Sequence, residues 1–342
     1  MRAVQYAHTG EVPRLVDLPD PGCPDDGVVV RVGATGVCRS DWHAWAGHDP
    51  VPLPHVPGHE LAGTVHAVGA EVRDWSVGDR VTVPFVCGCG RCAYCRAGDT
   101  HVCPDQTQPG FTGPGSFAEL VALRAADTNL VRLPDDLDLV TAASLGCRLA
   151  TAYRAVVTQG RLGSGDWLAV HGCGGVGLSA VLVGAALGAR LVAVDVSEDA
   201  LARAAELGAV ATVRATDPVA EVRDLTGGGA HVSLDAVGSP ATAVASVRSL
   251  RRRGRHVQVG LLLGDRATPP LPMDLVVAHE LEVLGSHGMP AHQYPELLDL
   301  VASGRIDPGL LVGRVIGLDE AGAALVSMSG PATTTGMTVV RL

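Results

Sequence analysis

The run His171-Gly172-Cys173-Gly174-Gly175-Val176-Gly177 decides the fold of the second half of this chain. It follows the apolar segment DWLAV (166–170) and leads into VGLSAVLVGAALG (176–188), which has the composition of a helix. Gly172, Gly174 and Gly177 fit G-x-G-x-x-G, where the glycines allow a tight turn, a close approach to a pyrophosphate and close packing of helix on strand. Phosphates would then lie at the N-terminus of the helix. With this context the run predicts a dinucleotide-binding turn rather than a glycine-rich turn without a ligand. The residues expected to bind are Gly172, Gly174, Gly175, Val176 and Gly177.

Asp195 ends the next apolar run, RLVAVD, 18 residues after Gly177. A carboxylate at this place can bond both hydroxyls of an adenosine ribose, and it repels a 2′-phosphate. The residues that follow, Val196-Ser197-Glu198-Asp199, include no arginine that could hold a phosphate. The sequence therefore predicts NAD(H) in preference to NADP(H).

Strand-like and helix-like segments alternate through the region that contains this turn, and such alternation is typical of a doubly wound parallel sheet. The predicted domain is an α/β Rossmann domain over residues 148–287. The expected strands are DWLAVHG (166–172), RLVAVDV (190–196), AVATVRA (209–215), HVSLDAVG (231–238), RHVQVGLL (255–262) and LEVLGS (281–286), and the helical segments between them include DALARAAELG (199–208), DPVAEVRDLTG (217–227) and PATAVASVRSLRRRG (240–254).

The first part of the chain has a different texture, with short apolar runs that Gly, Pro and Asp interrupt. Examples are GVVVRVGATGV (27–37), LAGTVHAVGA (61–70) and GDRVTVPFV (78–86). Closely spaced runs with turn signals indicate a β-rich, barrel-like domain over residues 1–147. From residue 288 the chain resumes mixed structure, and we expect residues 288–342 to return to this first domain.

Four cysteines form a compact pattern in the first domain. Cys89, Cys92, Cys95 and Cys103 have the spacing C-x2-C-x2-C-x7-C. Four thiolates this close in sequence can surround one tetrahedral ion and leave no open position, as structural zinc sites do.

A second, dispersed set consists of Cys38 in GVCRSDWH, His59 and Glu60 in PGHE, and Cys147 in SLGCRLATAY. Ligands from distant segments meet only after folding, and three protein ligands leave a fourth position for water or substrate. The sequence thus predicts a catalytic zinc in addition to the structural one, which makes two zinc ions per chain.

Composition excludes several other classes of protein. The chain of 342 residues has a net charge of −10 and no lysine, and its one short basic run, RRRGR at 251–255, is too small for a nucleic-acid surface. No apolar run approaches the roughly 20 residues that span a membrane, and the N-terminus has no signal-peptide core. Nine cysteines at metal-type spacings in such a chain indicate thiolate ligation in a reducing cytoplasm.

Both cysteine patterns, in this order and ahead of this nucleotide turn, resemble the zinc-dependent alcohol dehydrogenases of the medium-chain dehydrogenase/reductase superfamily. The segment GHELAGTVHAVGAEVRDWSVGDRV matches the family's G-H-E signature through Gly58-His59-Glu60 and Gly63. The resemblance implies a GroES-like catalytic domain interrupted by a Rossmann domain, with the active site in the cleft between them. It further implies that the substrates are small molecules, namely alcohols that are oxidised or aldehydes and ketones that are reduced. The resemblance also implies a homotetramer.

The resemblance also assigns roles to single residues. Cys38, His59 and Cys147 would hold the catalytic zinc, Glu60 would exchange with water as a ligand, and Asp41 would orient the histidine. Ser40 and His43 would relay the proton, Arg39 would contact the cofactor pyrophosphate, and Phe85 would line the substrate pocket unless it serves only core packing.

Alternatives remain open at this point. The same site would suit a polyol, amino-alcohol or threonine-type dehydrogenase, or a reductase of C=N bonds, and a non-catalytic zinc and nucleotide binder is the alternative from another class. Cys87 lies just before the four-cysteine pattern and is either a residue without a metal role or a competing ligand. Trp42 and Trp45 either line an apolar pocket or belong to the core. His48, His55 and His101 are expected to be surface or packing residues, and Cys23 and Cys173 free thiols.

Overall fold

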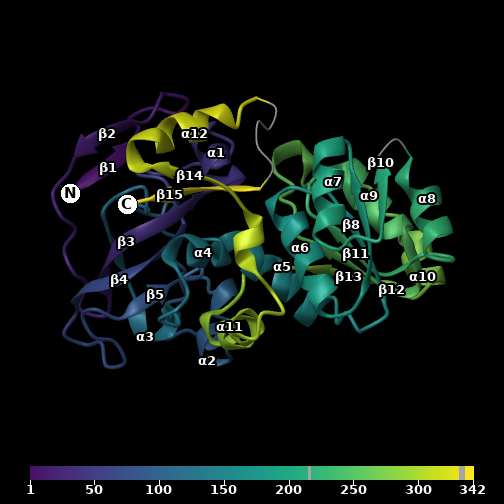
Figure 1. The fold of residues 1–342 in the computed structure, drawn as a ribbon, viewed down its shortest axis with the longest axis horizontal. Helices are drawn as coiled ribbons and strands as arrows, with labels where there is room; N and C mark the ends of the chain where they lie inside the picture. Colours follow the sequence, from purple (N-terminus) through teal and green to yellow (C-terminus); the bar gives the residue numbers. More distant parts are fainter. Residues whose placement is uncertain (215–216, 331–335) are drawn as a thin grey trace. The chain divides into compact units, whose positions relative to one another are not determined.

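The protein is described here by a computed structural model, which describes residues 1–214, 217–330 and 336–342. The chain forms two compact units. The first unit comprises Met1–Ala150, Gly288–Asp299 and Pro308–Leu342, and the second comprises Thr151–His287 and Leu300–Asp307 (Figure 1). These limits differ from the expected domain boundaries at residues 148–150 and 300–307. Residues 300–307 group with the second unit because they pack on it, as Arg305 does when it donates to the carbonyl of Ala186.

The second unit contains a six-stranded sheet in which every pair of neighbouring strands is parallel. Its order, β10-β9-β8-β11-β12-β13, reverses direction between β8 and β11. The expected doubly wound parallel sheet is thereby confirmed, and cofactors bind at the carboxyl ends of such strands where the order reverses. The strands are β8 Trp167–His171, β9 Arg190–Asp195, β10 Ala211–Arg214, β11 Ala230–Asp235, β12 Leu250–Gln258 and β13 Glu282–Gly285.

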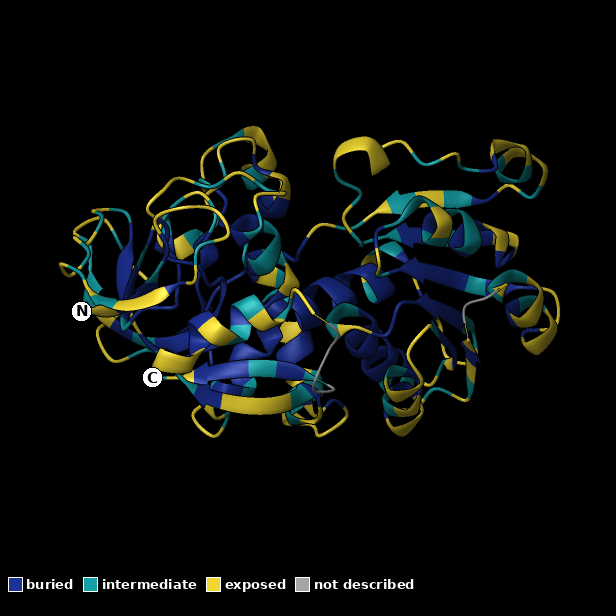
Figure 2. Ribbon diagram, turned by 90° about the horizontal axis from the view of Figure 1, so that it is seen from above, coloured by how far each residue is buried: buried dark blue, intermediate teal, exposed yellow. Residues whose placement is uncertain are grey.

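Apolar burial and helix caps stabilise this unit. Ala169, Val192 and Val213 lie in one buried cluster across β8, β9 and β10, and the strands of the sheet are mostly buried in Figure 2. Ser197 and Ser239 begin two of the helices by accepting a hydrogen bond from a backbone N–H of the first turn, as N-cap serines do. The helices are α6 Gly175–Ala186, α7 Glu198–Glu206, α8 Pro218–Leu225, α9 Pro240–Arg248 and α10 Met273–Ala278.

The arginine run after α9 lies in a strand, and one expected strand ends outside the described residues. Helix α9 ends at Arg248, so the RRRG run belongs to strand β12 and not to the helix as expected. The arginines there have partners across the neighbouring segments, for example Arg253 with Glu280 and Arg255 with Glu282. The last residue of the expected strand 209–215, Ala215, lies outside the described residues.

The first unit is built on a seven-stranded, largely antiparallel sheet with the order β14-β15-β3-β4-β5-β7, in which β6 also pairs with β3. A separate antiparallel pair, β1 and β2, completes its strands. Because β14 and β15 come from the C-terminal part of the chain, the chain returns to the first unit (Figure 1). The strands are β1 Arg2–Gln5, β2 Arg14–Asp17, β3 Val28–Val37, β4 Glu60–Val68, β5 Arg80–Thr82, β6 Leu120–Leu123, β7 Val131–Arg132, β14 Val312–Gly317 and β15 Met337–Arg341.

Short helices fill the connections of the first unit. They are α1 Arg39–Trp45, α2 Ala93–Arg96, α3 Ala126–Asn129, α4 Leu139–Ala143 and α12 Ala321–Ser327, together with the 3₁₀ turn η1 Thr100–Val102 and the π-helical turn η2 Leu145–Leu149. Helices α5 Ala150–Arg154 and α11 Tyr294–Ala302 lie where the chain passes between the units. None of the helices in the described ranges has the length and apolar character needed to cross a membrane.

Two candidate zinc sites and a candidate dinucleotide site

The dispersed residues Cys38, His59, Glu60 and Cys147 come together in the first unit, with one ligand atom from each within 4.8 Å of the others. Strand pairing explains the meeting, because Gly36 of β3 lies opposite Glu60 of β4. Cys38 follows β3 directly, and His59 directly precedes β4. Cys147 reaches the same point from the π-helical turn η2.

Asp41 fixes the orientation of His59. This fully buried carboxylate lies 2.9 Å from Nδ1 of His59, and it accepts hydrogen bonds from the backbone N–H groups of Gly58 and Cys38, each at 3.0 Å. With its hydrogen on Nδ1, His59 presents a lone pair on Nε2. That Nε2 atom is buried and has no hydrogen-bond partner among the described residues. An orphaned ring nitrogen beside two thiols fits a bound metal ion.

The ionisation of these residues supports the same conclusion. A hydrogen bond from Cys147 holds the pKa of the Cys38 thiol well below its ordinary value, whereas the same bond and burial raise the pKa of Cys147. Burial alone would lower the pKa of His59, but Asp41 and Cys38 together raise it well above the ordinary value, so a metal ion that binds there would displace a proton from Nε2. One thiolate and one thiol thus share a proton in a place where a divalent cation could replace it.

Glu60 has a partner that sequence reasoning missed. Nε of Arg148 donates to Oε1 of Glu60 at 2.9 Å, Nη2 donates to Oε2, and the backbone N–H of Arg148 donates to Oε1 at 3.2 Å. The side chain of Glu60 is fully buried and that of Arg148 is 8% exposed. Glu60 therefore lies within ligand distance of the metal cluster, but both of its oxygens accept hydrogen bonds from Arg148. The only sequence signal was an arginine directly after Cys147.

The proposed relay residues lie on α1, directly after Cys38. Oγ of Ser40 is 3.8 Å from Sγ of Cys38, so the hydroxyl borders the metal cluster. His43 is half-buried one turn farther along the helix. The helix thus carries a hydroxyl at the cluster and an imidazole beyond it, in the order that a relay requires.

Two aromatic rings flank His59. The ring centroid of Phe85 is 6.1 Å from that of His59, and the centroid of Phe111 is 5.0 Å away. Sequence reasoning identified Phe85 but not Phe111, which follows a glycine in an irregular loop. Both phenylalanines are only half-buried, so they leave apolar surface beside the metal cluster. Trp45, by contrast, belongs to a core cluster and donates its indole N–H to the carbonyl of Glu11.

Arg39 has partners within the first unit. Its guanidinium donates to the carbonyl of Met328 and lies over the ring of Trp42, 5.0 Å from the centroid. Trp42 in turn donates to Oγ of Ser329. A pyrophosphate contact by Arg39 would therefore replace or extend its bond to Met328.

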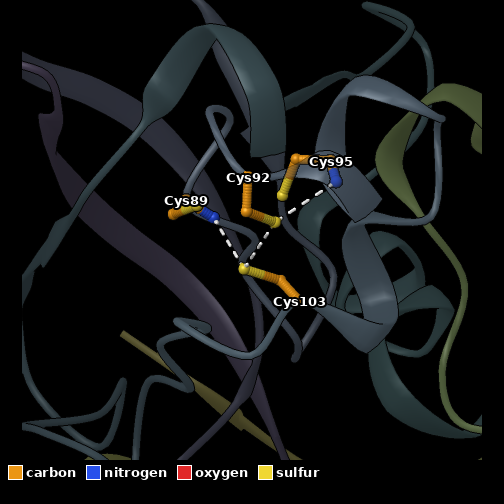
Figure 3. A group of neighbouring side chains, drawn as sticks. All are labelled: Cys89, Cys92, Cys95 and Cys103. Atoms are coloured by element: carbon orange, nitrogen blue, oxygen red, sulfur yellow. Dashed lines mark hydrogen bonds between the residues drawn. The ribbon is translucent and has the colours of Figure 1, made fainter.

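The four-cysteine pattern closes on itself (Figure 3). The sulfur atoms of Cys89, Cys92, Cys95 and Cys103 lie within 4.8 Å of one another. The backbone N–H of Cys95 donates to Sγ of Cys92 at 3.4 Å, and that of Cys89 donates to Sγ of Cys103 at 3.4 Å. Backbone donors of this kind stabilise thiolates, and hydrogen bonds from the loop backbone lower the pKa of Cys89 to about 6. The geometry suits a closed tetrahedral metal site.

Cys87 is not part of this cluster. It is buried in the apolar core of the sheet and its thiol donates to the carbonyl of Pro84. Burial in this core raises the pKa of the Cys87 thiol to about 12, and its sulfur is not among those that lie within 4.8 Å of one another in the cluster. Cys87 is thus a core residue, as expected of a residue without a metal role.

In the second unit the glycine turn joins β8 to α6. Gly172 has φ +96°, a left-handed conformation that favours glycine, and a Cβ on Gly177 would lie 1.7 Å from the carbonyl oxygen of Gly172. A Cβ on Gly174 would meet no protein atom within 4 Å. Packing within the described residues therefore explains two of the three glycines, and the third leaves open space at the N-terminus of α6.

Comparison with known proteins identifies the family to which the chain belongs. Residues 24–135 match the alcohol dehydrogenase GroES-like domain, and residues 175–303 match the zinc-binding dehydrogenase domain. The chain belongs to the zinc-dependent alcohol dehydrogenases of the medium-chain superfamily. An alcohol dehydrogenase of Geobacillus stearothermophilus is 34% identical over 86% of each chain, and the NAD-dependent alcohol dehydrogenase of Sulfurisphaera tokodaii is 34% identical over 95% of each. The solved structure of alcohol dehydrogenase TADH from Thermus sp. ATN1 is 33% identical, covers 100% of both chains and has a TM-score of 0.92.

The carboxylate expected to select the cofactor of this dehydrogenase lies beside the glycine turn. Asp195 accepts hydrogen bonds from the backbone N–H of Cys173 at 2.6 Å and from that of Ser197 at 2.9 Å. Strand pairing brings Arg214 of β10 opposite Asp195. The sequence analysis considered only the residues directly after Asp195 and did not identify this arginine. Arg214 forms an exposed ion pair with Glu198. The acidic side chain and an arginine thus lie on neighbouring strands at the place where the sequence predicts that an adenosine ribose binds.

Proposed function

We propose that this protein is an NAD(H)-dependent alcohol dehydrogenase that transfers hydride reversibly between an alcohol and an aldehyde or ketone at a catalytic zinc. The observation that carries the proposal is the Nε2 atom of His59, which is buried without a partner among the described residues between the thiols of Cys38 and Cys147. A set of three ligands with a neighbouring hydroxyl has the composition of an open, catalytic metal site.

When bound, zinc at Cys38, His59 and Cys147 would polarise the alcohol oxygen and lower the pKa of its hydroxyl, and the nicotinamide would accept the hydride. The chain supplies the surroundings for that chemistry. Asp41 holds His59 in the required tautomer, and Arg148 keeps the carboxylate of Glu60 neutralised beside the cluster. We propose that Glu60 can replace water as a ligand only when it leaves Arg148.

The proton leaves along α1 in this proposal. Ser40 accepts the hydroxyl proton of the alcohol and passes its own proton on, because a hydroxyl can donate and accept in one step. His43 receives it, since an imidazole titrates near neutrality. The rings of Phe85 and Phe111 exclude water from the side of His59 and form an apolar wall for the carbon chain of the substrate.

The cofactor would bind at the turn between β8 and α6. Its pyrophosphate would occupy the open space at Gly174 against the N–H groups of Gly175, Val176 and Gly177, with Arg39 as a cationic partner. Asp195 would bond the adenosine ribose and disfavour NADP(H). Residues 1–147 and 288–342 would accordingly form the zinc-containing catalytic domain, and residues 148–287 the NAD-binding domain.

The second metal would be structural. Four thiolates at Cys89, Cys92, Cys95 and Cys103 would fill every position of a tetrahedral zinc ion, which gives two zinc ions per chain. We also propose a cytoplasmic location, where a reducing environment would keep the nine cysteines as thiols and thiolate ligands. We also propose a homotetramer. The edge strand β13 and the exposed Met273 and Val277 of the neighbouring α10 offer a surface that another copy could cover.

Polyol, amino-alcohol and threonine dehydrogenation and the reduction of C=N bonds are alternative reactions for the same residues. The apolar rings of Phe85 and Phe111 favour simple or aromatic alcohols over polyols, because a polyol would need hydrogen-bond partners there. A non-catalytic zinc and nucleotide binder is the alternative outside the enzymes.

The deciding experiment measures NADH formation with NAD+ and a panel of primary, secondary, aromatic and polyhydroxy alcohols, with zinc content determined on the same preparation. We expect turnover with NAD+ and two zinc ions per chain. Cys147→Ser should lose turnover while Cys87→Ser, the matched control at a buried thiol outside both clusters and outside the glycine turn, keeps it. Protein that holds both zinc ions and NAD+ but turns over no member of the panel would indicate the non-catalytic alternative.

A further inference from the structure

A second histidine lies beside His43, on the far side from the metal cluster along α1. Nδ1 of His43 is 3.1 Å from Nδ1 of His48, and the two ring centroids are 5.3 Å apart. His43 is half-buried, whereas His48 is exposed. Two ring nitrogens at this distance share one hydrogen, which one donates and the other accepts.

The end of helix α1 fixes this contact. Gly47 has φ +81°, its N–H donates to the carbonyl of Ala44, and the N–H of His48 donates to the carbonyl of His43 at 2.9 Å. These two bonds define a Schellman motif, in which the second residue after the cap folds back over the third residue from the helix end. His48 is therefore held over His43 by the backbone itself.

A tryptophan supports both rings. Trp42 makes edge contacts with His43 and His48, with centroid distances of 5.1 Å and 5.2 Å. Its indole N–H donates to Oγ of Ser329, which anchors the indole to the segment after α12. The two imidazoles thus lie in a packed environment that limits their rotation.

The charged groups near the pair come from α1 and from the turn that follows it. Arg39 lies over Trp42 and donates to the carbonyl of Met328, and Asp41 is buried against His59. Asp49 follows His48 in the same turn, and its N–H donates to the carbonyl of His43.

We propose that His48 extends the proton path by one imidazole, so that the proton leaves the protein from His48 and not directly from His43. This inference rests on the proposed relay of Ser40 and His43. As the hydroxyl proton of the alcohol arrives at Nε2 of His43 through Ser40, the hydrogen on Nδ1 of His43 passes to Nδ1 of His48, and the hydrogen on Nε2 of His48 passes to water or a buffer base. One proton leaves per hydride transferred, and carbonyl reduction reverses each transfer.

The difference in exposure gives His48 its role. A half-buried ring exchanges protons only with the few solvent molecules that reach it, whereas an exposed ring meets water and buffer freely. An imidazole can accept a proton on one ring nitrogen and release one from the other. His48 therefore acts through His43 as a positioning and exit residue and does not touch the substrate.

The test compares parent, His43→Gln, His48→Gln and the double variant in single-turnover experiments. NADH absorbance and a pH-indicator dye follow hydride transfer and proton release separately, in weak buffer near pH 6.5. His8→Gln is the matched control, because His8 is an exposed histidine of the same unit. We expect His48→Gln to slow proton release about three- to tenfold, less than the loss for a group in direct contact, while zinc content and NAD+ affinity stay unchanged.

Two further readouts separate a proton exit from a structural role. Added free imidazole should restore the rate of proton release in His48→Gln but not change the parent, and the double variant should be no slower than His43→Gln alone. Independently of turnover, ¹⁵N spectra of the histidine rings should show a changed tautomer of His43 when His48 is replaced.

The outcomes distinguish the two levels of the proposal. If His43→Gln slows proton release while His48→Gln matches the parent in rate and in ring spectra, His48 has no part in the path and only this inference is overturned. If neither variant slows proton release, the relay itself fails, and the inference fails with it.

Discussion

Arg148 should be a determinant of stability in the first unit, although it is not a metal ligand. We consider Arg148→Met, which keeps the length of the aliphatic chain and removes the guanidinium. The variant leaves Glu60 fully buried without the partner that now meets both of its oxygens. Breaking a buried ion pair from one side costs about 3–5 kcal/mol, because an uncompensated charge or an unsatisfied acid stays behind.

The loss of stability should lower the melting temperature. For a unit of this size, each kcal/mol shifts Tm by roughly 2–4 °C, so the zinc-loaded variant should melt about 6–20 °C below the parent. Differential scanning calorimetry at pH 7.5 measures the shift. The double variant Arg148→Met/Glu60→Gln should regain most of the loss, because it removes the charge that lost its partner.

A matched control separates burial from charge. Arg314 and Glu320 also form an ion pair in the first unit, but their side chains are 50% and 49% exposed. Arg314→Met should therefore cost no more than about 1 kcal/mol. The reasoning is refuted if Arg148→Met melts within about 1 °C of the parent, or if Arg314→Met costs as much as Arg148→Met.

Five other substitutions test other parts of the structure. Ser40→Ala should reduce kcat on the order of 100-fold with zinc content unchanged; a loss of only a few-fold would leave Ser40 as a turn residue. Cys92→Ser should lower thermal stability and the closed-site zinc together, whereas Cys147→Ser should abolish turnover in a protein that stays folded; elemental analysis and calorimetry decide between these effects. Asp195→Gly should weaken NAD+ binding and raise kcat/KM for NADP+, since Arg214 lies opposite; parent enzyme with kcat/KM for NADP+ at least equal to that for NAD+ would contradict the assignment. Burial lowers the pKa of His171 to about 3, so the unfolded chain binds the extra proton below pH 6.5 and stability falls as pH falls through that range. His171→Leu should remove about 2 kcal/mol of the stability loss between pH 7 and pH 5, as urea unfolding at both pH values would show, and an unchanged loss would count against it.

Local patterns in the sequence predicted the parts of the molecule that local interactions determine. The turn from Gly172 to Gly177 lies between a strand and a helix because Gly172 adopts a left-handed conformation and Gly177 packs against the carbonyl of Gly172. The four-cysteine pattern closes because its spacing, together with one short helix beginning after Cys92, brings the thiols together. Such features depend on neighbours in sequence, so the pattern suffices to find them.

Contacts between distant segments are where the prediction was incomplete. Arg148 meets Glu60 across 88 positions of sequence, and Arg214 lies opposite Asp195 only through the register of β10 on β9. Phe111 reaches His59 from an irregular loop with no periodicity. Nothing in the spacing of these residues specifies the pairing, because strand register and side-chain direction decide it.

The buried pair of Glu60 and Arg148 also explains two glycines that seemed to be ordinary loop or strand residues. A Cβ on Gly36 would lie 2.2 Å from Oε2 of Glu60 and 2.8 Å from Nη2 of Arg148, and a Cβ on Gly146 would lie 3.0 Å from Cα of Glu60. Gly36 is on β3 just before Cys38, and Gly146 directly precedes Cys147. The two segments that deliver the thiols thus also leave the space for the ion pair. Any larger residue at Gly36 must push either the carboxylate or the strand that carries Cys38, so the ion pair and the metal cluster form one packed structure.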